Sequence, residues 1–465
     1  MQANGREEYD LVVIGSGSGL DVSSEAADAG LRVAVIDNGP FGGTCLNSGC
    51  IPSKMLIHSA DIAESIRTAS QFGINARIES IDWQAMMSRV YESIDPDSEM
   101  VLEGNKSHPN IDVFQETARF TGERSLEVAG RQITGDSVLI AAGTRPSAPK
   151  VPGIDSVRYL TSNEALRIPY QPARLAIVGG GYIAAELAHF FGALGTKVTI
   201  FYRGDRLLRR EDEDVSAAFT SAFQRRFDVR LHTRLLGISH VDGSSSERPA
   251  VALETESEDG GDTVEVDEVL FATGRVPNTD VLDAGAGGVE LDERGYVVVD
   301  EFMRTRANRT WALGDIVGRY ELKHNANLEA AHVAHNLMNP DNMLPVDYHA
   351  MPHAIFSSPQ VAGVGLTEQA ARDAGLHYAV GIERYIDTAY GEAIADRDGF
   401  VKVLADPESG ELIGCHIIGH DASILVQEVV NVMRARQTID DITRSIYIHP
   451  ALSEVVQRAC ARIGG

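Results

Sequence analysis

Two cysteines near the N-terminus stand in a segment that could carry out thiol chemistry. Cys45 and Cys50 lie five residues apart in GGTCLNSGCIPSK. The Asn-Ser-Gly between them can fold the chain back and bring the two Cα atoms within the ~4.4–6.8 Å that a disulfide needs. Pro52 favours a helix start here, so the helix dipole and Lys54 would both stabilise a Cys50 thiolate. The segment predicts a redox-active pair. Two inert buried cysteines or metal ligands are the alternatives, and no metal site is expected because no second Cys or His pair has matching spacing.

The remaining cysteines point to packing rather than chemistry. Cys415 lies in the apolar segment LIGCHIIG and Cys460 near the end of the last predicted helix, and both are expected in the core. Four cysteines in 465 residues cannot make a disulfide framework, and MQANGREEYD resembles no secretory leader. A cytoplasmic location is therefore expected. No membrane segment is expected either, because the apolar stretch Leu175–Gly195 contains Glu186, His189 and a triple glycine.

A first glycine turn predicts a nucleotide site. The segment DLVVIGSGSG runs to RVAVID and has the pattern of a strand, a tight turn, a helix and a second strand. Gly15 and Gly17 would let the backbone approach a pyrophosphate at the helix N-terminus. Asp37, at the end of the second strand, would accept hydrogen bonds from ribose hydroxyls. The third fingerprint position is Leu20 rather than Gly or Ala, and an ordinary turn between strand and helix is the alternative.

A second unit repeats this plan in RLAIVGGGYIAAELAHFFGALGTKVTIFY. Its turn contains Gly179 and Gly181, and Tyr202 occupies the position where an acid would bind the adenosine ribose. Arg203 and Arg209 follow, and guanidinium groups bind a 2′-phosphate that an acid would repel. The pattern favours NADPH over NADH, and an ordinary arginine-rich surface is the alternative.

The repeat also predicts the domain organisation. Both units close on a similar phrase, LIAAGTRP and LFATGRVPN, so the duplication has the size of a domain. The acidic stretch ESEDGGDT, residues 256–263, is expected to be a solvated loop. From about Asp347 the glycine fingerprint is absent, and short strands and helices predict a third, α+β domain.

One histidine near the C-terminus could act as an acid and base. In SIYIHPALSEVV a helix begun at Pro450 would turn the carboxylate of Glu454 back toward His449. A carboxylate partner gives an imidazole that can serve as a general base. Taken alone, such a histidine is more commonly an ordinary surface or core residue.

The composition is strongly acidic. The chain has 67 Asp and Glu against 41 Lys and Arg, a formal net charge of −26, and only six of the basic residues are lysines. Such a field repels phosphate backbones, so nucleic acid is not an expected partner. At ~1 M ionic strength the Debye length falls to ~3 Å and self-repulsion is screened. We expect a halophilic protein, with an acidic surface lacking salt adaptation as the alternative.

Five segments in this order resemble the pyridine nucleotide-disulfide oxidoreductases, the family of glutathione reductase and lipoamide dehydrogenase: GGTCLNSGCIPSK, GGGYIAAE, ATGRVPN, ALGD and HPALSE. The resemblance spans nearly the whole chain. It implies an α/β fold with two Rossmann-like dinucleotide-binding domains, for FAD and NADPH, and a C-terminal α+β dimerisation domain. The implied bounds are residues 1–150 and 280–346 for the FAD domain, 151–279 for the NAD(P) domain and 347–465 for the interface domain.

The resemblance also implies roles for single residues. Cys50 would be the charge-transfer thiol beside the flavin, and Cys45 the interchange thiol that attacks the substrate. His449, oriented by Glu454, would be the acid/base and would reach in from the other subunit of a homodimer. The implied cofactor contacts include a Lys54–Glu186 pair beside the flavin, Asp315 on the ribityl chain, Tyr182 as the gate of the nicotinamide pocket, and further contacts at Thr44, Gly143 and Gly274.

Within the family, the segments YRGDRLLRRED, LKHNANLEAAHVAHNL and YIHPALSEVV are most similar to mycothione reductases, and the acidic composition is similar to that of haloarchaeal bis-γ-glutamylcystine reductases. Both enzyme types reduce the disulfide of a small thiol. His58, Lys323 and His324 are candidates to receive an anionic substrate. A dihydrolipoyl dehydrogenase would be expected to carry an acid at Tyr202. A mercuric reductase would carry a further C-terminal thiol pair, and a flavin-binding structural or regulatory protein is the non-enzymatic alternative.

Overall fold

The computed structural model describes residues 6–241, 250–258 and 260–463. The chain divides into two compact units, which are described separately: Met1–Met55, Gln84–Ser147 and Arg275–Asp347 form the first, and Leu56–Trp83, Ala148–Gly274 and Tyr348–Gly465 form the second. The three-domain division inferred from the sequence stays a prediction. None of the described helices combines the length and the apolar character that a bilayer span requires.

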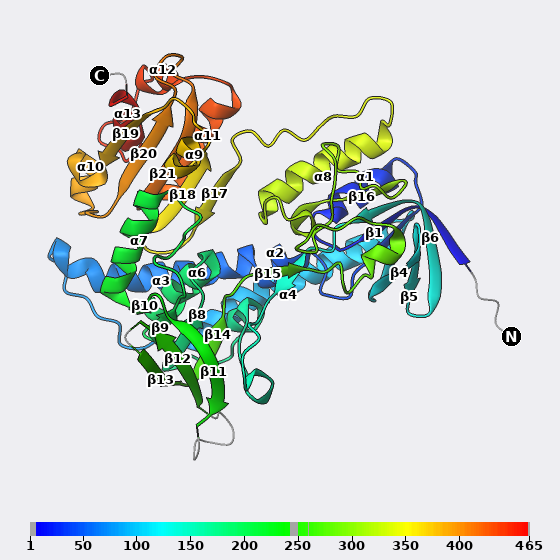
Figure 1. Cartoon of the computed structure of the whole chain (residues 1–465), viewed down its shortest axis with the longest axis horizontal. Coiled ribbons are helices and arrows are strands. Elements are labelled where there is room, and N and C mark those ends of the chain that lie inside the picture. The colour runs from blue at the N-terminus through cyan, green and yellow to red at the C-terminus, as the bar shows by residue number, and fades with distance from the viewer. Residues whose placement is uncertain (1–5, 242–249, 259, 464–465) are drawn as a thin grey trace. The chain divides into compact units, whose positions relative to one another are not determined.

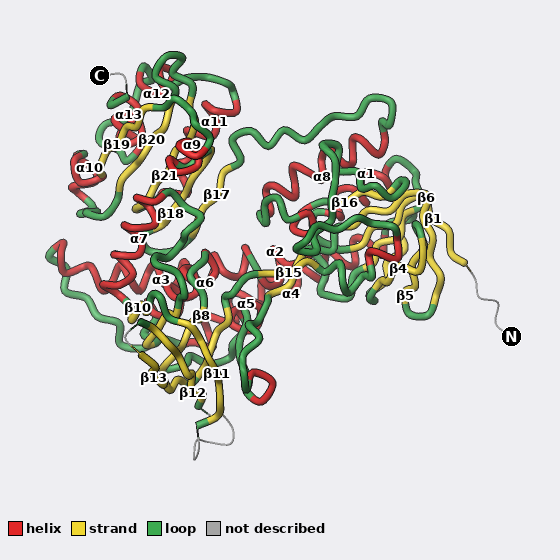
Figure 2. Tube along the Cα trace, viewed as in Figure 1, coloured by secondary structure: helices red, strands yellow, loops and turns green. Residues whose placement is uncertain are grey.

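A seven-stranded sheet forms the centre of the first unit (Figures 1 and 2). The strand order is β3–β2–β1–β6–β5–β4, with β16 beside β6. Neighbouring strands are parallel from β3 to β6 and between β6 and β16, and antiparallel from β6 to β4. The central strands end in buried apolar runs, residues 11–14 in β1 and 138–140 in β6, because a parallel sheet is covered on both faces. The bounds are β1 (Arg6–Ile14), β2 (Val33–Ile36), β3 (Ile111–Phe114), β4 (Ala118–Gly122), β5 (Ser125–Val128), β6 (Arg131–Ile140) and β16 (Thr310–Ala312).

Helices and a small second sheet complete the first unit. Helix α1 follows β1, and α8 packs beside α1 (Figure 1). Strands β7 and β15 pair in antiparallel fashion, so the two similar closing phrases noted in the sequence lie against each other. The bounds are α1 (Gly19–Asp28), α2 (Gly43–Ser48), α3 (Cys50–Thr68), which continues into the second unit, α4 (Trp83–Ser107), β7 (Thr144–Pro146), β15 (Arg275–Pro277), η3 (Ala284–Gly287), η4 (Gly314–Val317) and α8 (Lys323–Met338).

The part of the second unit that contains the second glycine turn has a parallel sheet, β10–β9–β8–β14, and an antiparallel sheet, β11–β12–β13. Residues 256–263 are mostly solvent-exposed, as expected, but their described part belongs mostly to β12 and β13 rather than to a loop. The bounds are η1 (Ala69–Phe72), η2 (Ile154–Ser156), α5 (Ser162–Leu166), β8 (Arg174–Val178), α6 (Tyr182–Ala193), β9 (Lys197–Phe201), α7 (Glu213–Arg226), β10 (Asp228–Arg230), β11 (Arg234–His240), β12 (Val251–Ser257), β13 (Gly260–Val266) and β14 (Glu268–Phe271).

The C-terminal part of the second unit is an antiparallel sheet with helices, which agrees with the predicted α+β class. The strand order is β17–β18–β21–β20–β19, and α11 and α13 pack on the sheet (Figure 1). Cys415 on β21 and Cys460 on α13 are both fully buried in its core. The bounds are β17 (Pro352–Ile355), β18 (Gln360–Gly365), α9 (Glu368–Asp373), β19 (Ala379–Arg384), η5 (Tyr385–Asp387), α10 (Ala389–Ala393), β20 (Phe400–Ala405), β21 (Leu412–Gly419), α11 (Ala422–Arg434), α12 (Ile439–Thr443) and α13 (Ser453–Ala461).

The internal repeat is visible in the backbone hydrogen bonds of the two glycine turns. The Gly15 amide donates to Ile36 O (2.8 Å), and the Gly179 amide donates to Phe201 O (3.0 Å). Both glycines have positive φ, +108° and +144°, and a Cβ on either would lie 2.3 Å from a carbonyl oxygen after the closing strand. Only glycine fits both turns.

Candidate active site

The two cysteines lie on consecutive helices and contact each other. Cys45 belongs to α2, and α3 begins at Cys50, as the position of Pro52 predicted. Both are free thiols, with Cys45 half-buried and Cys50 exposed. The hydrogen bond to the Cys50 thiol, together with burial, raises the pKa of the Cys45 thiol, while the positive charge of Lys323 lowers it. The two thiols therefore lie close enough to interact, as a redox pair requires.

A buried asparagine between the two cysteines holds this turn in shape, in agreement with the predicted chain reversal at Asn-Ser-Gly. Asn47 Nδ2 donates to the carbonyl oxygens of Phe41 (2.9 Å) and Gly43 (3.0 Å). A Cβ on Gly49 would lie 2.9 Å from Thr44 O, so the chain reverses too tightly there for a side chain. The polar residue between two cysteines was the available signal, since Asn commonly bonds nearby backbone. Thr44 itself is exposed.

In the first glycine turn, the predicted acid is bound to the backbone. Asp37 Oδ2 accepts from the Ser16 amide (2.6 Å), and Oδ1 accepts from the Gly39 amide (2.8 Å). Lys323 Nζ, from the start of α8, donates to Ser18 Oγ (2.8 Å) just before α1. The first unit therefore contains the first glycine turn, the N-terminus of α1 and the Lys323 ammonium group that acts on Cys45.

Three other predicted residues, Asp315, Gly143 and Gly274, lie close to the β7–β15 pair. Asp315 is half-buried, and its carboxylate accepts from Thr144 Oγ1 (3.3 Å). Burial raises the pKa of this carboxyl group, although the charge of Arg275 opposes that shift. Gly143 has φ +62° and accepts the Asn278 amide (3.2 Å) through its carbonyl oxygen. Gly274, with φ +116°, precedes β15.

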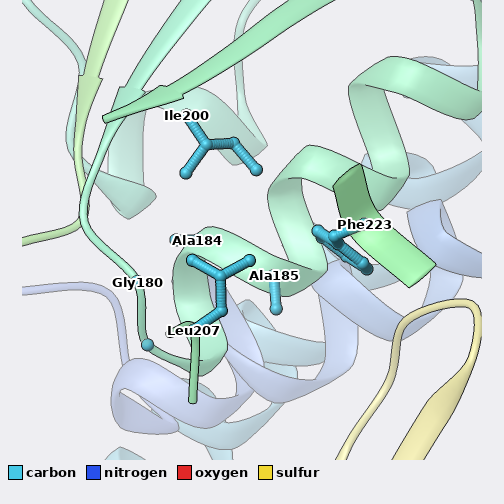
Figure 3. A pocket seen from close by; sticks show the side chains of 7 residues that line it. Gly180, Ala184, Ala185, Ile200, Leu207 and Phe223 are labelled. Atoms are coloured by element: carbon cyan, nitrogen blue, oxygen red, sulfur yellow. The ribbon is translucent and has the colours of Figure 1, made fainter. Parts of the chain in front are cut away.

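In the second glycine turn, an aromatic ring replaces the acid. A Cβ on Gly180 would lie 2.6 Å from Cγ of Tyr202, so the ring packs directly on the turn. No atom lies within 4 Å of a Cβ built on Gly181, and Tyr182 at the start of α6 is 44% exposed. Behind the turn lies a small apolar pocket with no room for a water molecule (Figure 3), lined by Gly180, Gly181, Ala184, Ala185, Ile200, Leu207 and Phe223.

The predicted arginines lie on the segment that follows Tyr202. Arg203 and Arg209 are exposed, and Arg209 Nε lies 3.4 Å from Asp205 Oδ1. The Leu208 amide donates to Gly180 O (2.7 Å), which ties this segment to the glycine turn. The structure therefore brings both guanidinium groups to the loop beside the second turn.

The C-terminal histidine and its carboxylate form the predicted pair. His449 Nδ1 lies 2.9 Å from Glu454 Oε1, and Glu454 Oε2 accepts the Ala451 amide (3.1 Å). The hydrogen bond to His449 lowers the pKa of Glu454. The expectation that the helix begins at Pro450 is wrong, since α13 begins at Ser453 and the carboxylate caps the preceding chain instead.

The Lys54–Glu186 pair stays a prediction, because the two residues lie in different compact units. Glu186 is buried on α6, and its Oε1 accepts the Phe356 amide (3.0 Å). Lys54 Nζ donates to Ser53 Oγ (3.3 Å).

Comparison with known proteins gives the family of the chain. Residues 9–330 match the pyridine nucleotide-disulphide oxidoreductase family, and residues 351–460 match the dimerisation domain of the same family. The chain belongs to this family. It is similar to mycothione reductase from Mycobacterium tuberculosis, with 42% identity over 97% of this chain and 99% of the relative.

Two further relatives bear on the function. Dihydrolipoyl dehydrogenase from Corynebacterium glutamicum is 33% identical over 99% of this chain and 98% of its own length. A solved structure of a Cu(II) complex of the HOCl-induced flavoprotein disulfide reductase RclA from Escherichia coli superposes with a TM-score of 0.86 at 28% identity, covering 98% and 99% of the two chains. The resemblance and the fold class inferred from the sequence are confirmed. The chain is an FAD- and NAD(P)H-dependent disulfide oxidoreductase.

The first glycine turn of this pyridine nucleotide-disulphide oxidoreductase fits the FAD that the family uses. Ser16 Oγ is buried in the turn without a hydrogen-bond partner among the described residues. A Cβ on Gly17 would meet no atom within 4 Å, and no side chain caps the N-terminus of α1. A pyrophosphate accepts such donors.

Proposed function

We propose that this chain uses NADPH to reduce the disulfide of a low-molecular-weight thiol of the mycothione or bis-γ-glutamylcystine type. The contact between the Cys45 and Cys50 thiols at the start of α3 carries the proposal. The near full-length similarity to a mycothione reductase supports this substrate class. Gly15, Gly17, Asp37 and Asp315 would hold FAD, which supplies two-electron exchange between the nicotinamide and the cysteines when bound.

The reaction of the thiols follows thiol–disulfide exchange. The Cys45 thiolate attacks one sulfur of the substrate disulfide, a mixed disulfide forms, and His449 gives a proton to the released thiolate. The Cys50 thiolate then attacks Cys45 Sγ, which forms the Cys45–Cys50 disulfide and frees the second thiol. The Cys50 thiol and burial raise the Cys45 pKa, and the charge of Lys323 opposes this rise and so favours the attacking thiolate.

Steady-state rates with NADPH and four disulfides test the substrate class: bis-γ-glutamylcystine, mycothione, glutathione disulfide and lipoamide. We expect the highest kcat/KM with bis-γ-glutamylcystine or mycothione. A preference for lipoamide with NADH would support the dihydrolipoyl dehydrogenase alternative instead. The ring of Tyr202 in place of an acid argues against that outcome.

Replacement of both Arg203 and Arg209 by Gln is expected to raise the KM for NADPH. Hydrogen bonds to charged groups contribute roughly 1.5–3 kcal/mol, so we expect about a 10- to 150-fold increase. The KM for NADH should stay nearly constant, because NADH has no 2′-phosphate. Arg234→Gln, a loss of the same charge at an exposed position of β11, is the control. An unchanged coenzyme preference in the double variant would refute the phosphate assignment.

We further propose that a homodimer shares the active site. The dimerisation domain supports the dimer. Ile446 and Ile448, which precede His449 closely in the chain, are 100% and 79% exposed. Large exposed apolar side chains commonly mark protein interfaces. The His449 side chain is itself 66% exposed. Its ring is thus available to a second copy of the chain.

The acidic composition supports adaptation to salt. The cytosolic location inferred from the cysteine content is a separate prediction. We expect the free energy of unfolding to rise from low to molar KCl, because added salt screens the repulsion within a chain of net charge −26. Chemical unfolding curves at both salt concentrations measure this. Equal stability at the two concentrations would remove the halophilic assignment.

A further inference from the structure

A row of ionisable side chains crosses the five-stranded sheet of the second unit. The strand register aligns His353 on β17, Gly363 on β18, His416 on β21 and Lys402 on β20 as successive neighbours. A Cβ on Gly363 would lie 2.8 Å from His353 Cε1 and 3.0 Å from His416 Nδ1, so only glycine leaves room for both rings. We call His353, His416 and Lys402 the charge row.

The acidic start of α7 packs on the charge row through a buried lysine. Lys402 is 1% exposed, and its Nζ donates to Asp212 Oδ1 (2.9 Å) and Asp214 Oδ2 (2.6 Å). Glu368 Oε2, on α9, lies 2.6 Å from the same nitrogen. An ammonium group has three N–H donors, and the carboxylates of Asp212, Asp214 and Glu368 use all three.

A second contact fixes the chain just before α7. His353 Nε2 lies 2.6 Å from Glu211 Oε2, and Gln369 Nε2 donates to Glu211 O (2.8 Å). Asp212 Oδ2 also accepts the Glu368 amide (3.0 Å). The backbone at residues 211–212 is therefore held by side chains and backbone groups from β17, β20 and α9.

The chain that these contacts hold leads directly to the second glycine turn. The Glu211 amide donates to Leu208 O (2.9 Å), and the Leu208 amide donates to Gly180 O (2.7 Å). Leu207 lines the apolar pocket together with Gly180 (Figure 3). Arg209 lies on this same stretch, whereas the backbone on both sides of Arg203 is held by hydrogen bonds from the Thr233 and His232 amides to residues 202 and 204. A displacement at residues 211–212 would therefore move the Arg209 guanidinium group relative to the turn.

We propose that Lys402 is a positioning residue for coenzyme selection, which places Arg209 to receive the 2′-phosphate of NADPH. The inference rests on the proposed role of Arg209 in binding this phosphate. Burying an ammonium group among carboxylates gains little stability compared with apolar packing, but it fixes one geometry because each partner must be satisfied. That geometry is what recognition of a phosphate by guanidinium groups requires.

Lys402→Gln tests the inference in the holoenzyme. We expect the KM for NADPH to rise at least tenfold, the KM for NADH to change less than twofold, and kcat to stay within twofold. Lys197→Gln removes a lysine at an exposed position of β9 in the same unit and should leave every constant unchanged. In the Arg203→Gln/Arg209→Gln background, Lys402→Gln should add nothing to the KM for NADPH, because the residue that it positions is gone.

Glu368→Gln removes one of the three carboxylates at a partly exposed position and keeps the test available if Lys402→Gln does not fold. We expect a two- to threefold rise in the KM for NADPH alone. A folded Lys402→Gln or Glu368→Gln protein with an unchanged KM for NADPH, or with equal rises for both coenzymes, would overturn the inference. If the arginine variants alter coenzyme preference and the Lys402 and Glu368 variants do not, only the positioning role of Lys402 is refuted. If the arginine variants have no effect, the binding of the 2′-phosphate by these arginines is refuted as well.

Discussion

Cys45→Ser is expected to lower kcat for disulfide reduction at least about 10³-fold, which corresponds to roughly 4 kcal/mol in the barrier. A serine hydroxyl is not ionised at neutral pH and cannot form the mixed disulfide through which the exchange proceeds. Oxidation of NADPH by a small quinone should persist, because both glycine turns are intact in the variant. Paired assays with a thiol disulfide and with a quinone measure the two activities.

Ser48→Ala is the matched control, since it removes a hydroxyl from the same helix α2 without touching either thiol. We expect turnover within about twofold of the unmodified chain, because surface substitutions away from special features have small effects. Full disulfide turnover by the Cys45→Ser protein would contradict the role assigned to Cys45.

His449→Gln is expected to lower kcat roughly 10²- to 10³-fold, the range typical of a lost general acid. Glu454→Gln should cost less, because the imidazole remains and only its orientation is weakened. The hydrogen bond to His449 holds the Glu454 pKa below its usual value. The contribution of this hydrogen bond to the free energy of unfolding is therefore complete above about pH 4.3. It is lost as the pH falls through the lowered pKa of Glu454 in the folded state. His420→Gln is the control, since His420 is also an exposed histidine beside an acid, with 3.4 Å between His420 Nε2 and Asp421 Oδ2.

Mixing two inactive variants shows whether His449 acts on the other subunit. Cys45→Ser and His449→Gln subunits that exchange freely should recover up to about a quarter of full activity, because each mixed dimer then has one site with both residues intact. If His449 served its own subunit, every site would lack one residue. No recovery among subunits shown to exchange would therefore contradict the shared site.

The glycine turns and the cysteine pair could be predicted because their chemistry is local. Glycine is required at positions 15 and 179 because the backbone of each turn passes too close to a carbonyl oxygen for a side chain. The residue that decides between an acid, Asp37, and its replacement, Tyr202, follows the next strand of each unit, so it can also be identified from the sequence. Residues 256–263 have the composition of a loop for a physical reason. The side chains that β12 and β13 bury come from outside this stretch, such as Val251, Leu253 and Val266, so the stretch itself has mostly exposed polar residues although its strands pair in antiparallel fashion.

The charge row could not be found from the sequence, because its members come together only through strand register. His353 and Lys402 are separated by two other strands in the sheet, and their partners Glu211 and Asp212 lie far away in the chain. The acidic run that follows the arginine cluster was the available signal. It resembled a solvated face, which is the usual place for such residues.

We propose that Cys45 and Cys50 alternate between a disulfide and two thiols as electrons pass outward. Anaerobic alkylation of the oxidised holoenzyme, before and after addition of NADPH, tests this claim when mass spectrometry locates the modified cysteines. We predict that Cys45 and Cys50 become alkylated only after NADPH is added, while the buried Cys415 and Cys460 stay unmodified in both samples. Equal alkylation of Cys45 and Cys50 with and without NADPH would contradict the account.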